Sequence, residues 1–221
     1  MKNNIYKNMM MKNFINASIE IMSEEGIEGI TIRKVAAKVS VNSATIYNHF
    51  DNLEHLKVFS CLLCFDEYIN DIESYLDDTK DLEYNYKKIW ECFINHTIDN
   101  IPVFYTLFFN SLEKDLGEYI KEYYEIFPIK NKNYNNSIIS MLNKASLEKR
   151  NEILLEEMSK LGMISSDRVS WINDMSVYTY ESILHRIYTN KVDPNEGAKK
   201  IYSYICSVLE ENLIKNSEKS Q

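Results

Sequence analysis

The chain has 221 residues, of which 45% are hydrophobic and 26% charged, and its formal net charge is −8. This apolar content excludes a disordered chain, and the acidic balance argues against a protein that coats nucleic acid non-specifically. Only 5 Gly and 3 Pro are present, which disfavours turn-rich β-sandwiches and barrels as well as Gly-rich phosphate loops. We therefore predict an all-α protein of long helices and short connections.

The N-terminal segment has the pattern of a helical domain. Apolar residues recur at helical spacing from Phe14 onward, and Gly26 is placed to end that helix. Thr31 can cap a short second helix, and Asn42 can cap a third one over 43–50, after a turn of three residues. Two short helices joined in this way form a helix-turn-helix.

The third predicted helix has an uncovered face of small or hydrogen-bonding residues. Hydroxyls and amides read base edges in the major groove of B-DNA, and alanine can contact a thymine methyl. The alternative is a structural three-helix subdomain with an ordinary solvated surface. The residues on this face are Ser43, Ala44, Thr45, Asn48 and His49.

The charge is unevenly distributed along the chain. Residues 1–60 contain seven basic and six acidic side chains, so the remaining 161 residues carry −9. We expect the basic residues of the N-terminal segment to lie near the groove side, where they would attract the DNA backbone. They are Lys7, Lys12, Arg33, Lys34 and Lys38.

The runs 21–36 and 41–50 resemble the DNA-binding domain of TetR-family transcriptional regulators. The resemblance covers about residues 10–57 and rests on Gly26, Thr31, Arg33, Ala36, Thr45, Tyr47, His49 and Phe50, which fall at the family's spacing. It implies a dimeric repressor whose second domain binds a small inducer. It also implies that Thr31, Tyr47 and His49 contact phosphates, with Arg33, Ser43, Ala44 and Thr45 at or near bases; Asn48 completes the predicted surface.

Two positions depart from the family's pattern. The turn position that usually holds Gly is Ser40, where a left-handed backbone would cost about 1 kcal/mol. The start of the fourth helix, predicted over about 53–75, usually offers a Lys to a phosphate, and here that residue is Leu53. Lys57, one turn later, is the candidate replacement.

Residues 58–221 read as helical throughout, so we predict a DNA-binding domain over 1–57 and a ligand-binding and dimerisation domain over 58–221. Asp81 caps one predicted helix. The others are expected over 103–112, between Gly117 and Pro128, over 133–161 with a break in 146–152 and an end at Gly162, over about 165–190 and over about 193–215.

The last two predicted helices carry apolar stripes with a spacing of three and four residues. Two such pairs can form a four-helix bundle across a two-fold axis, and a two-fold protein can read a palindrome. Alternatively, the stripes only complete the core of one protomer. The predicted dimerisation residues are Ile172, Met175, Ile183, Ile187, Ile201, Ile205 and Val208.

Aromatic residues are abundant, with 16 Tyr in the chain. An aromatic-lined cavity could hold a flat apolar or aromatic inducer, either neutral or cationic and paired with Glu91 or Asp99, although such stripes are more often plain core. The predicted ligand-binding residues are Trp90, Phe93, His96, Tyr105, Phe108, Tyr123, Trp171 and Tyr178.

We predict no catalytic site, cofactor or metal ion. Cys92 and His96 share the spacing of a ligand pair, but the sequence shows no second pair to complete four-coordination. Cys61 and Cys64 lie inside a predicted helix, unlike a redox motif. No apolar run approaches the 18 or so residues of a membrane span, and the N-terminus lacks an apolar signal segment, so we expect a cytoplasmic protein with reduced thiols.

The sequence thus predicts a ligand-responsive repressor that leaves its palindromic operator when an inducer changes the spacing of its two reading heads. The alternative is a DNA-binding structural or cell-cycle protein of the same fold that has no small-molecule inducer. An enzyme is disfavoured because no catalytic constellation stands out in the sequence.

Overall fold

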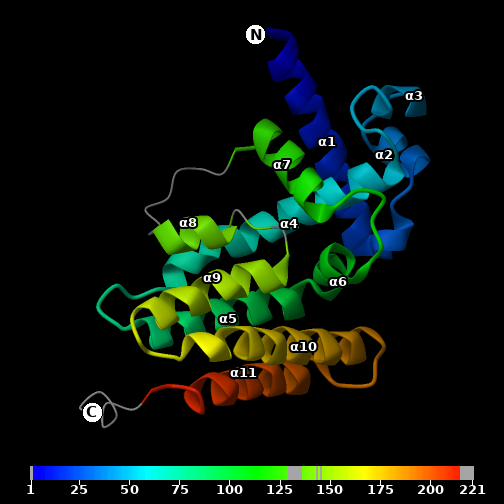
Figure 1. The fold of residues 1–221 in the computed structure, drawn as a ribbon. Helices are drawn as coiled ribbons and strands as arrows, with labels where there is room; N and C mark the ends of the chain where they lie inside the picture. The colour runs from blue at the N-terminus through cyan, green and yellow to red at the C-terminus, as the bar shows by residue number, and fades with distance from the viewer. Residues whose placement is uncertain (1, 129–135, 143, 145, 215–221) are drawn as a thin grey trace. The chain divides into compact units, whose positions relative to one another are not determined.

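The computed structural model describes residues 2–128, 136–142, 144 and 146–214, and this part of the chain is helical without a strand (Figure 1). The predicted all-α class is confirmed. No helix among these residues is long and apolar enough to cross a membrane. The α-helices are α1 (Lys2–Glu25), α2 (Ile32–Lys38), α3 (Ser43–Ile46), α4 (Leu53–Tyr75), α5 (Leu82–Asp99), α6 (Ile101–Phe109), α7 (Leu116–Ile126), α8 (Asn136–Leu142), α9 (Leu147–Lys160), α10 (Val169–Tyr188) and α11 (Pro194–Glu210).

The helices form two compact units, and α4 contributes to both. The first unit combines the residues up to Asp66 with the segment that begins at Pro102 and contains most of α6 and all of α7. The second combines residues 67–101 with α8 to α11. The domain boundary that the sequence places after residue 57 stays a prediction.

The helix α1 is longer than predicted, because it begins at Lys2 rather than near Phe14. Among residues 5–13 only Met11 is buried, so the apolar periodicity of this stretch did not indicate a helix. The end of α1 is as predicted. Gly26 has φ 76°, a left-handed conformation that glycine adopts without steric cost.

The helix α3 is shorter than predicted and ends at Ile46 instead of Phe50. After it, the backbone N–H of Asn48 donates to the carbonyl of Thr45, and that of His49 donates to Ile46. These bonds span three residues rather than four, so the chain tightens into turns that carry Tyr47 to His49. The side chains of Ile46 and Phe50 are both buried and anchor this segment.

The break predicted within Ser146 to Glu152 lies earlier in the chain. Ser146 is the N-cap of α9, and its hydroxyl accepts a hydrogen bond from the backbone N–H of Lys149 at 3.3 Å. The polar stretch therefore begins a helix instead of bending one. The predicted start at residue 133 lies outside the described residues. The last helix, α11, ends at Glu210, about five residues before the predicted end near Lys215.

The other predicted helix ends are close to those observed. At the end of α9, Gly162 has φ 68° and the N–H of Met163 donates to the carbonyl of Met158 at 2.9 Å, which confirms the predicted C-terminal motif. Asp81 caps α5, as predicted. The helix α6 runs over Ile101–Phe109, two to three residues earlier than the predicted 103–112.

The core of the second unit contains buried hydrogen bonds between helices. The indole N–H of Trp90 on α5 donates to Asn151 on α9 at 3.1 Å, and the Asn151 amide donates to Asn173 on α10 at 2.9 Å. The hydroxyls of Tyr180 and Thr97 lie 3.0 Å apart. These polar groups satisfy one another, as buried polar groups must.

The turn between α2 and α3 stores backbone strain at Ser40. This residue has φ 59°, and the N–H of Val41 donates to the carbonyl of Ala36 at 2.9 Å, as in a glycine-ended helix. The left-handed backbone predicted at this position is therefore present without the glycine that would relieve it.

Replacing Ser40 with Gly should raise the free energy of unfolding by about 0.5–1 kcal/mol, because relief of the left-handed strain outweighs the added entropy of the unfolded chain. Ser40→Val should lower it, since a β-branched residue tolerates this conformation worst. Chemical denaturation of both variants measures the effect. A Gly variant no more stable than the Val variant would contradict the assignment.

Candidate DNA-binding surface

The exposed face at α3 presents short polar and aromatic side chains above an apolar anchor. The side chain of Asn42 caps α3 by accepting a hydrogen bond from the N–H of Ala44 at 2.9 Å. Ala44, Tyr47 and Asn48 are exposed, whereas Ser43 and Thr45 are half-buried. A surface of hydroxyl, amide and methyl groups has the chemistry to read base edges and contact phosphates.

His49 lies at the edge of this surface. It is half-buried, and its ring lies 5.6 Å from that of Phe14 on α1. Burial lowers the pKa of His49, and the nearby charge of Lys7 lowers it further. The imidazole is therefore neutral at pH 7 and can offer a phosphate a hydrogen bond, but not a full charge.

Thr31 and Arg33 flank the start of α2. The Thr31 hydroxyl oxygen caps the helix by accepting a hydrogen bond from the N–H of Lys34 at 3.3 Å, which leaves its own O–H free to point outward as a donor. The side chain of Arg33 is exposed. Both positions suit the roles that the sequence assigns to them, which stay predictions.

The basic patch is smaller than the sequence suggests. Lys34 pairs with Glu25, and Lys38 lies 2.9 Å from Glu20 and 3.7 Å from Glu24. All three acids belong to the end of α1, which packs beside α2. The paired lysines therefore contribute little net charge to the surface, although both are exposed. The exposed cations of this surface that form no ion pair among the described residues are Lys7, Lys12 and Arg33.

Lys57 also has an acidic partner. Its ammonium lies 3.0 Å from Glu28, and its side chain is only 18% exposed. Lys57 lines a cavity of about 250 Å³ that Leu53 and Glu54 also border. A phosphate contact by Lys57 would require it to leave Glu28, so its role as a replacement for the missing family lysine stays a prediction.

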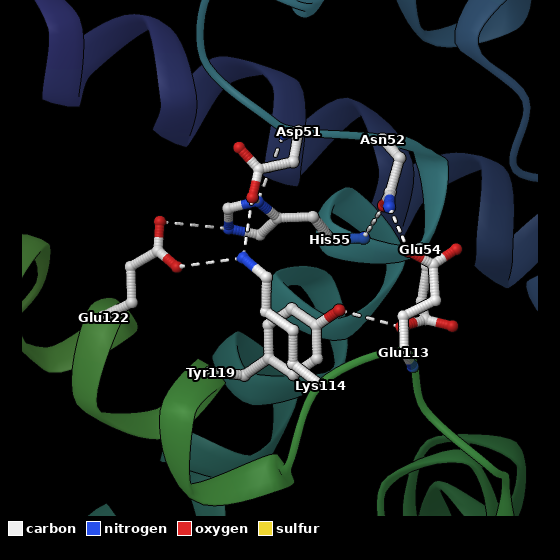
Figure 2. A network of polar contacts seen from close by, with 8 residues as sticks. All are labelled: Asp51, Asn52, Glu54, His55, Glu113, Lys114, Tyr119 and Glu122. Carbon is white, nitrogen blue, oxygen red and sulfur yellow. Dashed lines mark hydrogen bonds and ion pairs between the residues drawn. The ribbon is translucent and has the colours of Figure 1, made fainter.

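A polar network holds the first turn of α4 against the segment that leads into α7 (Figure 2). Lys114 donates to Asp51 at 2.6 Å, and Asn52 donates to Glu113 at 2.6 Å. Beside that bond, the backbone N–H of Glu113 and the hydroxyl of Tyr119 both donate to Glu54, at 2.7 and 2.8 Å. Because α4 begins a few residues after α3, these bonds fix the backbone at the point where the chain leaves the exposed segment 43–49.

His55 occupies the centre of this network and is 1% exposed (Figure 2). The backbone N–H of Asp51 donates to its Nδ1 at 3.2 Å, so Nε2 carries the proton of the neutral ring. That Nε2 lies 3.4 Å from a carboxylate oxygen of Glu122, without hydrogen-bond alignment. Burial lowers the pKa of His55 despite the two nearby carboxylates of Glu122 and Asp51.

The predicted ligand-binding residues do not all lie in one cluster. Trp90 and Phe93 are buried, with ring centroids 5.9 Å apart, and a cavity of only about 20 Å³ borders them. That is room for about one water molecule. His96 is half-buried in the same unit, while Tyr105, Phe108 and Tyr123 belong to the first unit.

Trp171 and Tyr178 are not core residues, in contrast to the predicted aromatic cluster. Their side chains are 39% and 58% exposed on α10, and the guanidinium of Arg168 lies 4.2 Å from the centre of the Trp171 ring. The spacing of the aromatic residues did not reveal that Trp171 and Tyr178 face solvent, because α10 carries large apolar residues on two opposite faces. Only the face with Ile172, Val177 and Leu184 is buried within the protomer.

Four of the seven predicted dimerisation residues are buried inside the protomer, where α10 and α11 lie side by side (Figure 1). These are Ile172, Ile187, Ile201 and Ile205. Their stripes complete the core of one chain, which was the alternative reading. Met175 is 40% exposed, and Ile183 and Val208 are half-buried.

Residues 14–56 match the family of bacterial regulatory proteins described as the tetR family. The biofilm operon icaADBC HTH-type negative transcriptional regulator IcaR of Staphylococcus aureus (strain Newman) is 35% identical over 63 residues. That alignment covers 28% of this chain and 33% of the relative, so the chain spans about a third of that relative's length. IcaR of Staphylococcus epidermidis is 27% identical over 82 residues, 37% of this chain and 44% of the relative.

Solved structures share the fold over nearly the whole chain. One is Thermus thermophilus FadR, a TetR-family transcriptional repressor in complex with lauroyl-CoA, with a TM-score of 0.62 at 13% identity, covering 94% of this chain and 97% of that one. Another is a putative TetR-family regulator from Shewanella sp. PV-4, with a TM-score of 0.57 at 12% identity and coverage of 93% and 98%.

The buried His55 should make the protein less stable in acid. Because its pKa is lowered in the folded state, the unfolded chain takes up the proton first, so the free energy of unfolding falls as the pH drops below about 6.5. The slope from one such group is at most about 1.4 kcal/mol per pH unit. Denaturation between pH 7.5 and 5.5 should show a smaller slope in His55→Gln than in the parent.

His185→Gln serves as the matched control, because this imidazole is exposed on α10. It removes a histidine from the second unit and leaves the network around His55 in place. Equal slopes for the parent and His55→Gln would contradict the account of His55.

Proposed function

We propose that this chain is a dimeric transcriptional repressor of the TetR type that a small molecule releases from DNA. The observation that carries the proposal is the solvent-facing surface of Ala44, Tyr47 and Asn48, held by the buried Ile46 and Phe50. It lies within residues 14–56, which match the family, and the chain is also similar to the negative regulator IcaR over 63 residues.

In this proposal, the half-buried Ser43 and Thr45 and the exposed Ala44 and Asn48 lie along base edges. Tyr47, Thr31 and His49 hydrogen-bond to phosphates on either side. Lys34, Lys38 and Lys57 are paired with acids, so neutral hydrogen-bond donors would supply much of the contact with DNA. Hydrogen bonds to phosphate then set the position of the head, while groove contacts select the sequence.

A dimer is supported by the outer face of α10 and α11. Trp171, Met175 and Tyr178 fall on one side of α10, opposite its buried stripe, and Tyr204 on α11 is 50% exposed. Several large exposed apolar side chains on neighbouring helices are typical of an interaction site. We propose that two such surfaces pair across a two-fold axis, which would place two reading heads about 34 Å apart on successive major grooves.

An inducer is supported by the similar fold of Thermus thermophilus FadR, whose structure contains lauroyl-CoA. In this chain, the cavities beside Trp90 and beside Tyr86 hold only about 20 and 30 Å³. Binding of a larger apolar molecule would therefore open the packing of α5 against its neighbours. That opening would release DNA only if the inducer binds the open state more tightly than the DNA-bound one.

The small size of these cavities favours one alternative function, namely a DNA-binding protein of the same fold that needs no inducer. The two functions differ in one measurement. A repressor of the proposed kind loses affinity for its operator in the presence of some small molecule, whereas the alternative protein binds DNA equally with every compound tested.

Thr45→Ala and Tyr47→Ala should each weaken DNA binding by about 5- to 100-fold, because each removes a hydrogen-bonding group from the reading surface. The measurement is a gel shift with duplexes that the full chain selects from random sequence. Circular dichroism should stay that of the parent, since neither side chain is part of the buried core.

Tyr84→Ala is the matched control for Tyr47→Ala, because Tyr84 is also an exposed tyrosine but lies on α5 in the second unit. It should bind DNA like the parent. If the parent selects no duplex, or if Tyr47→Ala and Tyr84→Ala bind equally well, the proposed reading surface is wrong.

Tyr178→Lys should convert the protein into monomers, because it buries an unpaired charge in the proposed apolar interface. Sedimentation velocity of the full chain tests this, with Tyr84→Lys as the control that stays dimeric. A dimer that persists in Tyr178→Lys would place the interface elsewhere. Ile205 is unsuitable for this test, because a charge at a position only 1% exposed would unfold the protomer.

A further inference from the structure

Three side chains of metal-ligating types meet in the second unit, although the sequence shows only two of them as a pair. Cys92 and His96 lie one turn apart on α5, and Asp71 comes from the last turns of α4. One ligand atom from each, a sulfur, a ring nitrogen and a carboxylate oxygen, lies within 4.8 Å of the other two. Asp71 on α4 thus adds a third ligand to the pair that the sequence shows on α5.

The spacing of these atoms suits a tetrahedral ion. His96 Nε2 lies 3.2 Å from Asp71 Oδ2. Two nitrogen or oxygen ligands bound to zinc at about 2.0–2.1 Å are about 3.3 Å apart in a tetrahedron, so this edge already has the required length. Cys92 is four residues before His96, which puts both on one face of the helix. A thiolate sulfur and a nitrogen or oxygen ligand on one zinc ion are about 3.5 Å apart, so the sulfur would have to approach by at most about 1.3 Å to complete the third corner.

A second layer of contacts orients the carboxylate. The hydroxyl of Ser74 donates to Asp71 Oδ1 at 2.8 Å, one turn along α4. This bond leaves Oδ2 as the oxygen that faces His96. Hydrogen bonds of this kind fix the ligands of natural metal sites and strengthen their affinity.

The three residues differ in burial, so the cluster is closed at Cys92 and open to solvent at Asp71. Cys92 is fully buried, the His96 side chain is 17% exposed, and the Asp71 side chain is 44% exposed. An ion could therefore enter from the side of Asp71, with water in its fourth position. Without an ion, burial raises the pKa of the Cys92 thiol to about 12, with Asp71 and Glu91 adding to the shift, so the sulfur carries a proton.

We propose that Asp71, Cys92 and His96 bind one divalent transition-metal ion of the zinc class. A thiolate and an imidazole favour Zn²⁺, Co²⁺ or Ni²⁺ and disfavour Mg²⁺ and Ca²⁺, which prefer oxygen ligands. The ion displaces the thiol proton, which passes to the solvent, so affinity rises with pH. Such an ion ties the end of α4 to α5 and is independent of whether the chain binds DNA.

The test is a titration of the chelator-treated full chain with Co²⁺, whose thiolate complexes have a charge-transfer absorption. We expect a band that saturates at one Co²⁺ per chain and disappears when Zn²⁺ is added. Cys92→Ser should lose the band, and His96→Gln should weaken binding by at least about tenfold. Cys206→Ser is the matched control, because it removes another helical cysteine from the same unit and should keep the band.

The alternative is that His96 and Asp71 form a simple ion pair beside a core cysteine. The absence of a saturable band in the parent would establish that alternative and overturn the proposal, as would a band that persists in Cys92→Ser. If Cys92→Ser does not fold, the partly exposed ligands decide the question. Asp71→Asn and His96→Gln would then bind Co²⁺ like the parent only if the proposal is wrong.

Discussion

The burial of an aromatic cluster at the junction of α3 and α4 is the constraint on which the reading surface depends. The ring of Phe50 lies 6.4 Å from Phe14, 5.4 Å from His55 and 5.9 Å from Phe59, in edge-to-face arrangements. This cluster ties α1 to the start of α4 and leaves Tyr47 and Asn48 facing outward. A neutral His55 is compatible with that apolar setting, whereas a protonated one would place a charge among aromatic rings.

Electrostatic pairing within the N-terminal unit changes how DNA recognition can work. The acids at the end of α1 pair with two of the lysines of α2, and Glu28 pairs with Lys57. The surface that remains offers a few exposed cations and many neutral hydrogen-bonding groups. Such a surface would gain less from counterion release than a strongly basic one. In the proposed function, binding would therefore rely on geometry and on the doubling of contacts in a dimer.

The second unit combines a well-filled core with an exposed apolar face. The chain of hydrogen bonds from Trp90 through Asn151 to Asn173 satisfies its buried polar groups, which stabilises one arrangement of α5, α9 and α10. The cavities beside Trp90 and beside Tyr86 in this unit are close to the size of single water molecules. Ligand binding here would thus be coupled to a rearrangement of helices, which is the coupling that a regulator needs.

The sequence by itself determined the features that depend on neighbouring residues. The ends of α1 and α9 at Gly26 and Gly162, and the caps at Thr31, Asn42 and Asp81, are confirmed, because capping involves atoms only a few residues apart. The family resemblance likewise rested on local spacing. Only the tertiary structure decided which apolar face of α10 is buried, which lysines form ion pairs with acids, and that Asp71 joins Cys92 and His96. These outcomes depend on which helix packs beside which, and the periodicity of a single helix carries no information about its partner.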